Sequence, residues 1–156
     1  MLRSIKALLP ALAALALTLV AAQPAQTAGL ADTVIAEARK ACEGFQNGKF
    51  HPGDAVQQID LDGNGTHDTV VDESKFACSS AASMYCGTGG CMLHTIVGNK
   101  KRAFQVEGWR MINWDGRSIL LLARDGGWCG GAGAQLCFQA IYWSMGDMLT
   151  MGDKGE

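Results

Sequence analysis

The stretch WRMINWDGRSILLLA at residues 109–123 shows most clearly which fold the chain adopts. Two runs rich in apolar side chains flank the pair Asp115-Gly116, whose residue types favour the positive φ angles of a tight hairpin turn. Such a pair between two strand-like runs is the strongest short-range hairpin signal. We therefore predict that residues 109–114 and 118–123 form two antiparallel strands joined by this turn.

Five further runs have the length and composition of short strands. They cover residues 56–60, 69–72, 92–97, 103–106 and 138–144. Turn signals separate them, for example Gly98-Asn99 and residues 145–147, and no helical crossover long enough for parallel pairing lies between them. The expected sheet is a twisted antiparallel β-meander or a small open barrel.

Residues 30–45 precede these strands and carry apolar side chains at helical spacing. The predicted buried stripe consists of Leu30, Val34, Ala38, Ala41, Cys42 and Phe45. Asp32 near the start and Arg39 with Lys40 near the end complement the helix dipole. One N-terminal helix packed on an antiparallel sheet gives an α+β fold, and the 48% hydrophobic and 18% charged composition is that of a compact globular domain.

The first 28 residues differ from the rest of the chain. Arg3 and Lys6 precede an apolar run at residues 7–22. This run is shorter than the roughly 20 residues that span a bilayer, and a basic start followed by a short apolar run is typical of a secretory signal peptide. We therefore interpret residues 1–28 as a signal peptide, with an uncleaved membrane anchor as the alternative.

Cleavage is expected after Ala22 or after Ala28, where small residues precede the cut. The mature protein is then a single disulfide-rich domain at residues 29–156, periplasmic or secreted, with no membrane span. Residues 1–28 contain two basic and no acidic residues, so this domain has 11 basic against 15 acidic residues and a formal charge of −4. An acidic domain does not favour nucleic-acid binding, which needs a basic patch.

All six cysteines lie in the predicted mature domain. An even number of cysteines in a short exported chain indicates a disulfide framework. Spacing favours three pairs, which are Cys86 with Cys91, Cys129 with Cys137, and Cys42 with Cys78. The loops that they close would contribute roughly 2, 2.5 and 4 kcal/mol in that order. A zinc site or a catalytic dithiol is the alternative, but the chain has no CxxC pair to support either.

The stretch DLDGNGTHD at residues 60–68 is the most informative for function. Ca²⁺ prefers hard oxygen ligands, and Gly65 permits the sharp turn that wraps an ion. The predicted ligands are the side chains of Asp60, Asp62, Asn64 and Asp68 and the carbonyl oxygen of Thr66. The sequence therefore predicts one structural Ca²⁺ site, with Mg²⁺ or a metal-free Asx-rich turn as the alternatives.

This loop resembles the calcium loop of FG-GAP and VCBS-type modules, whose pattern D-x-D/N-x-D/N-G-x-x-D leads directly into a strand. The resemblance covers this loop alone, and it implies calcium binding by the residues just named. An EF-hand is excluded, because Val71 stands where that motif has a bidentate Glu. The wider chain, with its DLDGNG, FACSSAASMYCGTGGC, NWDG and CGGAGAQLC segments, resembles small exported bacterial proteins of unassigned function, which implies no activity.

No combination of residues predicts a specific catalytic mechanism. The histidines lack a neighbouring nucleophile or base in a known pattern; they are His51, His67 and His94. Asp72 and Glu73 are adjacent strand residues and are expected to point to opposite faces. Asp115 with Asp125 is the other carboxylate pair. We expect no enzymatic activity, and a small carboxylate-dependent hydrolase is the alternative.

Tryptophan is abundant, and aromatic side chains often anchor binding surfaces. Trp109 and Trp114 are expected on opposite faces of one strand. Trp128 adjoins a disulfide-closed loop that would lose little entropy on docking, which makes it the candidate binding residue. The leading hypothesis is a non-enzymatic domain that binds a protein or a cell-envelope component. The alternative is an inhibitor of a hydrolase, a lysozyme or a protease, which inserts the Cys129 to Cys137 loop into the cleft of its target.

Overall fold

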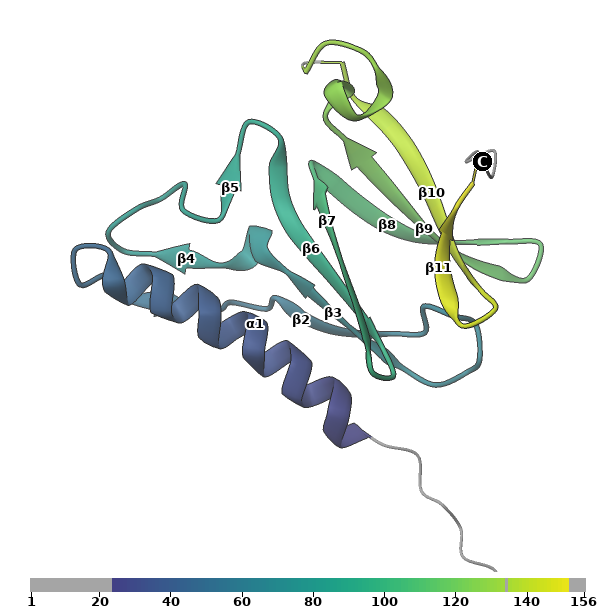
Figure 1. Ribbon diagram of the computed structural model, residues 1–156, viewed down its shortest axis with the longest axis horizontal. Coiled ribbons are helices and arrows are strands. Elements are labelled where there is room, and N and C mark those ends of the chain that lie inside the picture. Colours follow the sequence, from purple (N-terminus) through teal and green to yellow (C-terminus); the bar gives the residue numbers. More distant parts are fainter. Residues whose placement is uncertain (1–23, 134, 152–156) are drawn as a thin grey trace, which may run out of the picture.

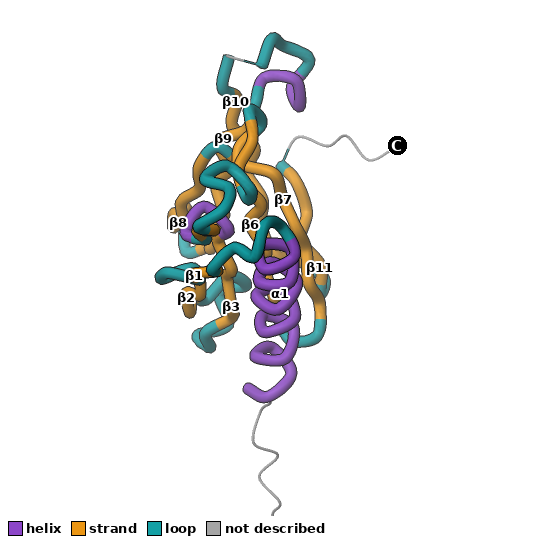
Figure 2. Tube along the Cα trace, turned by 90° about the vertical axis from the view of Figure 1, so that its left-hand side faces the viewer, coloured by secondary structure: helices purple, strands orange, loops and turns teal. Residues whose placement is uncertain are grey.

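The computed structural model of the protein describes residues 24–133 and 135–151, which form three layers (Figure 1). Helix α1 (Pro24–Gly44) is the first layer, a five-stranded middle sheet is the second, and a four-stranded outer sheet is the third. The helix covers one face of the middle sheet and the outer sheet covers the other (Figures 1 and 2). This confirms the predicted α+β class, and within the described residues the sheets remain open.

The middle sheet is antiparallel throughout. Its strands are β2 (Val56–Ile59), β3 (Asp68–Asp72), β6 (Gly90–Val97) and β7 (Lys100–Val106), with β5 (Cys86–Gly87) paired to the start of β6. All five residues of β3 are buried, because both faces of this strand are covered. Its adjacent residues Val70 and Val71 are therefore both apolar, and its polar residues Asp68, Thr69 and Asp72 are buried as well.

The outer sheet is a four-stranded antiparallel meander. Its strands are β8 (Gly108–Trp114), β9 (Arg117–Arg124), β10 (Cys137–Ser144) and β11 (Asp147–Thr150). The predicted hairpin is present: Asp115 and Gly116 have φ angles of 51° and 74°, as a two-residue hairpin turn requires. Met145 and Gly146, at 51° and 76°, make a similar turn into β11, a strand that we did not predict.

Several short elements also have no counterpart in the sequence analysis. β1 (Phe50–His51) pairs with β4 (Ala77–Cys78) as a separate small sheet, and 3₁₀ helices η1 (Glu73–Lys75) and η2 (Gly126–Cys129) follow β3 and β9. Segments of two to four residues are too short to show a hydrophobic period. Their positions depend on contacts with the larger elements.

Two hydrophobic cores lie on opposite faces of the middle sheet. The helix core, between α1 and the middle sheet, contains Ala31, Val34, Ala38, Cys42, Phe50, Ala55, Val71, Phe76, Cys78 and Ile96. The sheet core, between the two sheets, contains Leu61, Val70, Leu93, Val97, Val106, Leu120, Leu122 and Ile141. The neighbours Val70 and Val71 of β3 therefore face different cores. The strands that we expected in one meander are divided between two packed sheets.

Helix α1 begins earlier and buries a slightly different stripe than predicted. It starts at Pro24 rather than at residue 30 and ends at Gly44. Ala31 is buried although the stripe omitted it, whereas Ala41 and Phe45 are exposed. Phe45 follows the last helical residue, so the helical period no longer directs it to the core.

The predicted signal peptide, residues 1–28, lies for the most part outside the described residues, which begin at Pro24. The last residues of that prediction belong to the start of α1. None of the helices in residues 24–133 and 135–151 is long and apolar enough to cross a membrane.

Three disulfides join the layers and loops, and they pair the cysteines as their spacing predicted. Cys42–Cys78 connects the last turns of α1 to β4, with both cysteines buried in the helix core. Cys86–Cys91 joins β5 to β6, and Cys129–Cys137 closes the loop between η2 and β10. The first spans a sequence separation of 36 residues and therefore restricts the unfolded chain most.

Removal of the long-range disulfide should therefore destabilise the protein more than removal of a local one. We expect the double variant Cys42→Ala/Cys78→Ala to lower the free energy of unfolding by about 4 kcal/mol and Cys86→Ala/Cys91→Ala by about 2 kcal/mol. Urea unfolding of the oxidised proteins measures both changes. Equal losses in the two variants would contradict the dependence on loop length.

Candidate metal centre

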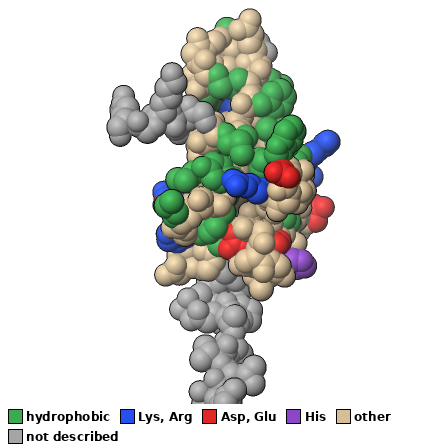
Figure 3. Space-filling view, turned by 90° about the vertical axis from the view of Figure 1, so that its right-hand side faces the viewer, with side chains coloured by type: hydrophobic (Ala, Val, Ile, Leu, Met, Phe, Trp, Pro, Cys, Tyr) green, Lys and Arg blue, Asp and Glu red, His purple; other side chains and the backbone are tan. Residues whose placement is uncertain are grey.

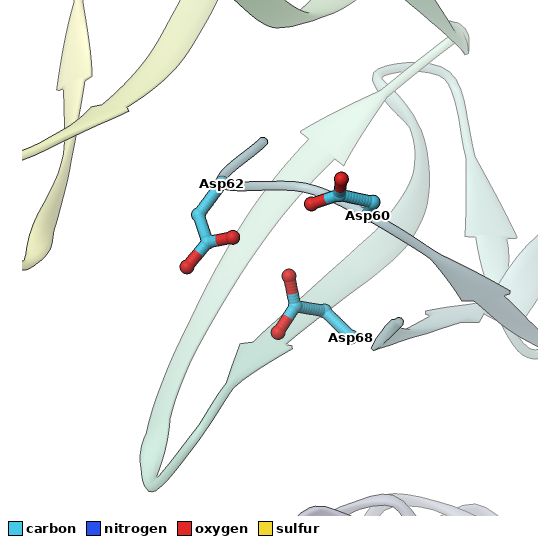
Figure 4. A group of neighbouring side chains, drawn as sticks. All are labelled: Asp60, Asp62 and Asp68. Carbon is cyan, nitrogen blue, oxygen red and sulfur yellow. The ribbon is translucent and has the colours of Figure 1, made fainter. Parts of the chain in front are cut away.

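Three carboxylates lie close together in the loop between β2 and β3 (Figure 4). Asp60 directly follows β2, Asp62 lies two residues further on, and Asp68 is the first residue of β3. One oxygen atom from each side chain lies within 4.8 Å of the other two. Figure 4 shows the three side chains turned toward a common point. The structure thus brings together the three acidic residues among the five predicted ligands.

The carboxylate of Asp60 folds the loop around itself. It accepts hydrogen bonds from the backbone N–H groups of Gly63 (2.8 Å), Asn64 (3.1 Å) and Gly65 (2.9 Å). Gly63 and Gly65 have φ angles of 77° and 84°, a region that strongly favours glycine. The glycines in DGNG are therefore needed for the turn that brings these N–H groups to one carboxylate.

Asn64 and Thr66, the two other predicted ligands, hydrogen-bond within the loop. The side-chain oxygen of Asn64 accepts from the backbone N–H of Thr66 at 2.7 Å and from its hydroxyl group. The Asn64 amide nitrogen donates to Asp62 at 2.9 Å. Both residues are exposed, so they brace the turn at its outer side while the carboxylates occupy its inner side.

Asp68 is the buried member of the cluster, with 5% of its surface exposed. Its carboxylate accepts a hydrogen bond from the backbone N–H of Leu61 at 3.0 Å. Burial raises the pKa of Asp68 above its ordinary value, and the charges of Asp62 and Asp60 raise it further, while the Leu61 hydrogen bond acts in the opposite direction. The ionised carboxylate is therefore held in an unfavourable environment that a nearby cation would improve.

The loop also connects the two sheets. Leu61, between the first two aspartates, is 2% exposed and belongs to the sheet core. A Cβ atom placed on Gly63 would lie 3.7 Å from the hydroxyl oxygen of Ser118 in β9, so the loop lies against the outer sheet. The position of the acidic cluster is thus coupled to the packing between the sheets.

The donor set fits a divalent hard cation. Carboxylate oxygens are the preferred ligands of Ca²⁺, and three of them supply enough negative charge to bind it. A metal-free Asx turn would account for the hydrogen bonds to Asp60, but it does not require a second and third carboxylate beside the first. The cation would contribute charge compensation inside the loop, and Asp60, Asp62 and Asp68 are the residues that would hold it.

A buried pair that the sequence analysis missed lies on η1 and β6. Nε2 of His94 lies 2.7 Å from a carboxylate oxygen of Glu73, and both side chains are largely buried. The other ring nitrogen, Nδ1, is buried and has no hydrogen-bond partner among the described residues. The two residues are 21 positions apart, so no local spacing reveals the pair. His51 and His67 are exposed.

The carboxylate pairs considered for acid–base catalysis have other placements. Asp72 is buried, accepts a hydrogen bond from the indole N–H of Trp109 at 2.9 Å, and caps η1 through the backbone N–H of Ser74. Asp115 and Asp125 flank β9 at opposite ends, so the length of an eight-residue strand separates them. The described residues therefore do not place these carboxylates as a catalytic pair.

Trp128, the candidate binding residue, lies in η2 and is 60% exposed. Its ring covers the guanidinium group of Arg124, whose Cζ atom is 3.9 Å from the ring centroid. Trp109 packs against the sheet core and Trp114 is 69% exposed, in agreement with their expected positions on opposite faces of β8. Trp128 is thus available to a partner and is held by a neighbouring side chain.

Comparison with protein-family models, with curated proteins and with solved structures finds no match to this chain.

The buried charge of Asp68 gives a testable consequence. Without divalent cations at pH 7, we expect Asp68→Asn to be at least as stable as the native protein, because its amide oxygen still accepts from Leu61 and carries no charge. Below pH 3.8 native Asp68 is protonated in both folded and unfolded states, and the native protein loses stability relative to the variant as the pH rises through the raised pKa.

Thermal unfolding of the metal-depleted protein, in buffers freed of divalent cations by a chelating resin, measures this difference between pH 3.5 and 7. Asp68→Ala is the control, because it removes the acceptor for Leu61 and should destabilise by about 1 to 3 kcal/mol. An Asp68→Asn variant that is as unstable as Asp68→Ala would show that the charge itself is needed in the absence of metal.

Proposed function

We propose that the protein is a non-enzymatic periplasmic or secreted binding domain, held together by three disulfides and by one Ca²⁺ ion bound to Asp60, Asp62 and Asp68. The observation that carries the proposal is the convergence of these three carboxylates in a loop whose Leu61 enters the sheet core. The resemblance of the loop to FG-GAP and VCBS-type calcium loops supports it. The disulfides support an oxidising compartment.

The proposed ion has a structural role. An ion that binds the folded chain alone stabilises it according to its concentration relative to Kd, and extracellular calcium sites function with Kd values up to about a millimolar. Ca²⁺ suits this loop better than Mg²⁺, since Ca²⁺ accepts irregular coordination by several carboxylates, whereas Mg²⁺ requires a small regular octahedron.

The outer sheet supports a binding role. Its residues alternate between the sheet core and an outward face, and one row across this face pairs Ile112 with Ile119, Ile119 with Tyr142, and Tyr142 with Leu149. Ile119 is buried although it belongs to neither core, because its neighbours on this face cover it. Figure 3, which faces this side of the molecule, shows hydrophobic surface gathered here.

Exposed aromatic residues extend this apolar face toward its ends. Trp114 at the end of β8 is 69% exposed and Phe138 at the start of β10 is 68% exposed. Contiguous apolar surface of this kind marks interaction sites in soluble proteins. The partner is a protein or a cell-envelope component that contacts the outer sheet.

Inhibition of a hydrolase is a second candidate function, favoured by the loop between β9 and β10. This loop extends beyond the sheets (Figure 1), is closed by Cys129–Cys137, and carries the exposed side chain of Trp128. A rigid protruding loop can enter an enzyme cleft with little loss of entropy.

Calcium should raise the thermal stability of the oxidised protein. With Ca²⁺ at about one hundred times its Kd, the free energy of unfolding is expected to rise by about 2.7 kcal/mol relative to EGTA. Differential scanning calorimetry measures the shift. Asp62→Ala should abolish it, whereas the matched control Asp32→Ala, an exposed helix residue away from the loop, should retain it. Equal midpoints of the native protein in Ca²⁺ and EGTA would exclude the proposed ion.

The inhibitor candidate has its own test. Lysozyme and protease assays with the oxidised protein should show inhibition that Trp128→Ala weakens and that Trp114→Ala, at the end of β8 away from this loop, leaves intact. The absence of inhibition across both enzyme classes would remove this candidate and leave the calcium proposal unaffected.

A further inference from the structure

Arg124, the last residue of β9, is a buried cation without an acidic partner in the part of the chain that the structure describes. Arg124 is 6% exposed. No carboxylate in residues 24–133 or 135–151 forms an ion pair with its guanidinium. Burial lowers the pKa of this guanidinium, which shows the same unfavourable environment. Buried charges in proteins are normally paired, so an unpaired one indicates that its partner comes from elsewhere.

The hydrogen bonds of Arg124 leave one side of the guanidinium free. Nη1 donates to the side-chain oxygen of Gln139 at 2.6 Å, and Gln139 is itself oriented by its amide nitrogen, which donates to Thr150 at 3.3 Å. Nε is buried and has no hydrogen-bond partner among residues 24–133 and 135–151. Nη2 donates no hydrogen bond to these residues either, so it is the N–H group from which a partner's carboxylate oxygen would accept.

The neighbouring acidic residue does not neutralise Arg124. The carboxylate of Asp125 accepts from the backbone N–H of Gly127 at 2.9 Å and caps η2. This cap and the Cys129–Cys137 disulfide position Trp128, whose ring lies over the guanidinium. The ring is still 60% exposed, so a ligand that reaches Arg124 also contacts the indole.

We propose that Arg124 and Trp128 form a binding site for a carboxylate of a protein partner, carried next to an aromatic or apolar side chain. This site is separate from the proposed calcium site. It rests on the proposed binding role, and it specifies that the partner presents a carboxylate. Leu136, which is 55% exposed and precedes Cys137, supplies an apolar side chain near the same disulfide. Trp and Arg are the residue types that most often dominate the energy of protein interfaces.

A carboxylate fits this site better than a phosphate. Residues 125–151 contain no lysine or arginine, so Arg124 is the one basic residue that this part of the chain contributes. A single positive charge balances a monoanion and not a dianion. A guanidinium N–H suits a carboxylate oxygen as its acceptor, and the burial of Arg124 disfavours a strongly hydrated ion.

The test uses the oxidised protein in Ca²⁺ and follows its ¹H–¹⁵N NMR spectrum at constant ionic strength. The probes are N-acetyl-L-phenylalanine, which carries a chain-end carboxylate, and N-acetyl-aspartyl-phenylalaninamide, which carries a side-chain carboxylate. N-acetyl-phenylalaninamide is the uncharged control. We expect at least one of the two acids to shift the Arg124 Nε–H and Trp128 indole signals saturably, and the uncharged control to shift neither signal. The acid that binds with the lower Kd shows whether the partner's carboxylate comes from a chain end or from a side chain.

Three variants separate binding from folding. Arg124→Met should abolish the shift of the indole signal while leaving the melting temperature unchanged or higher, because it replaces an unpaired buried charge by an apolar chain. Trp128→Ala should weaken binding roughly tenfold, as expected for the loss of an aromatic contact. Arg110→Met, which removes an exposed arginine of β8, is the matched control and should bind as the native protein does.

Several outcomes would overturn the proposal. One is the absence of a saturable shift up to about 50 mM acid, a concentration that would fill a site with a millimolar Kd. The others are an equal response to the uncharged control, equally tight binding of inorganic phosphate, and binding by Arg124→Met that equals that of the native protein. A marked fall in the melting temperature of Arg124→Met would show that Arg124 serves the fold instead. None of these results changes the expected effect of Ca²⁺, so failure of this site is distinguishable from failure of the calcium proposal.

Discussion

The buried carboxylate of Asp68 links the acidic loop, the middle sheet and the sheet core. It begins β3, and it accepts the backbone N–H of Leu61, whose side chain packs between the sheets. A charge in this position is unfavourable in the absence of a counter-ion, because Asp68 is buried and two other carboxylates lie nearby. The proposed divalent cation would offset this repulsion by joining the three groups. The acidic loop therefore connects proposed ion binding directly to the packing of the domain.

The layered arrangement separates stability from recognition. The middle sheet is covered on both faces, and the Cys42–Cys78 disulfide and the sheet core hold its two neighbours against it. The outer sheet has one face in that core and one face free, with Trp114 and Phe138 exposed near its two ends. Arg124 and Trp128 lie at the end of this sheet where the disulfide-closed loop begins. The proposed partner would thus contact the outer sheet without disturbing the elements that stabilise the fold.

The features that were predictable from sequence depend on local geometry. The Asp115-Gly116 turn, most of the stripe of α1, the local disulfides and the acidic loop are all encoded within a few residues of one another. The division into two sheets was not predictable, because β7 and β8 are consecutive in the chain and yet pair with other strands, β7 with β6 and β8 with β9. The pair His94 and Glu73 and the unpaired charge of Arg124 also depend on tertiary packing. The elements of two residues, β1 and β4, are too short to give any periodic signal.

The central claim is that an ion in the acidic loop stabilises the junction between the sheets. Backbone amide hydrogen exchange tests it most directly, because the N–H of Leu61 donates to Asp68 inside this junction. Exchange is measured in Ca²⁺ and in EGTA under otherwise identical conditions. The account predicts that Ca²⁺ slows exchange at Leu61, at Gly63 to Gly65 and at sheet-core residues such as Leu93 and Leu120. Identical exchange rates in the two conditions would contradict it.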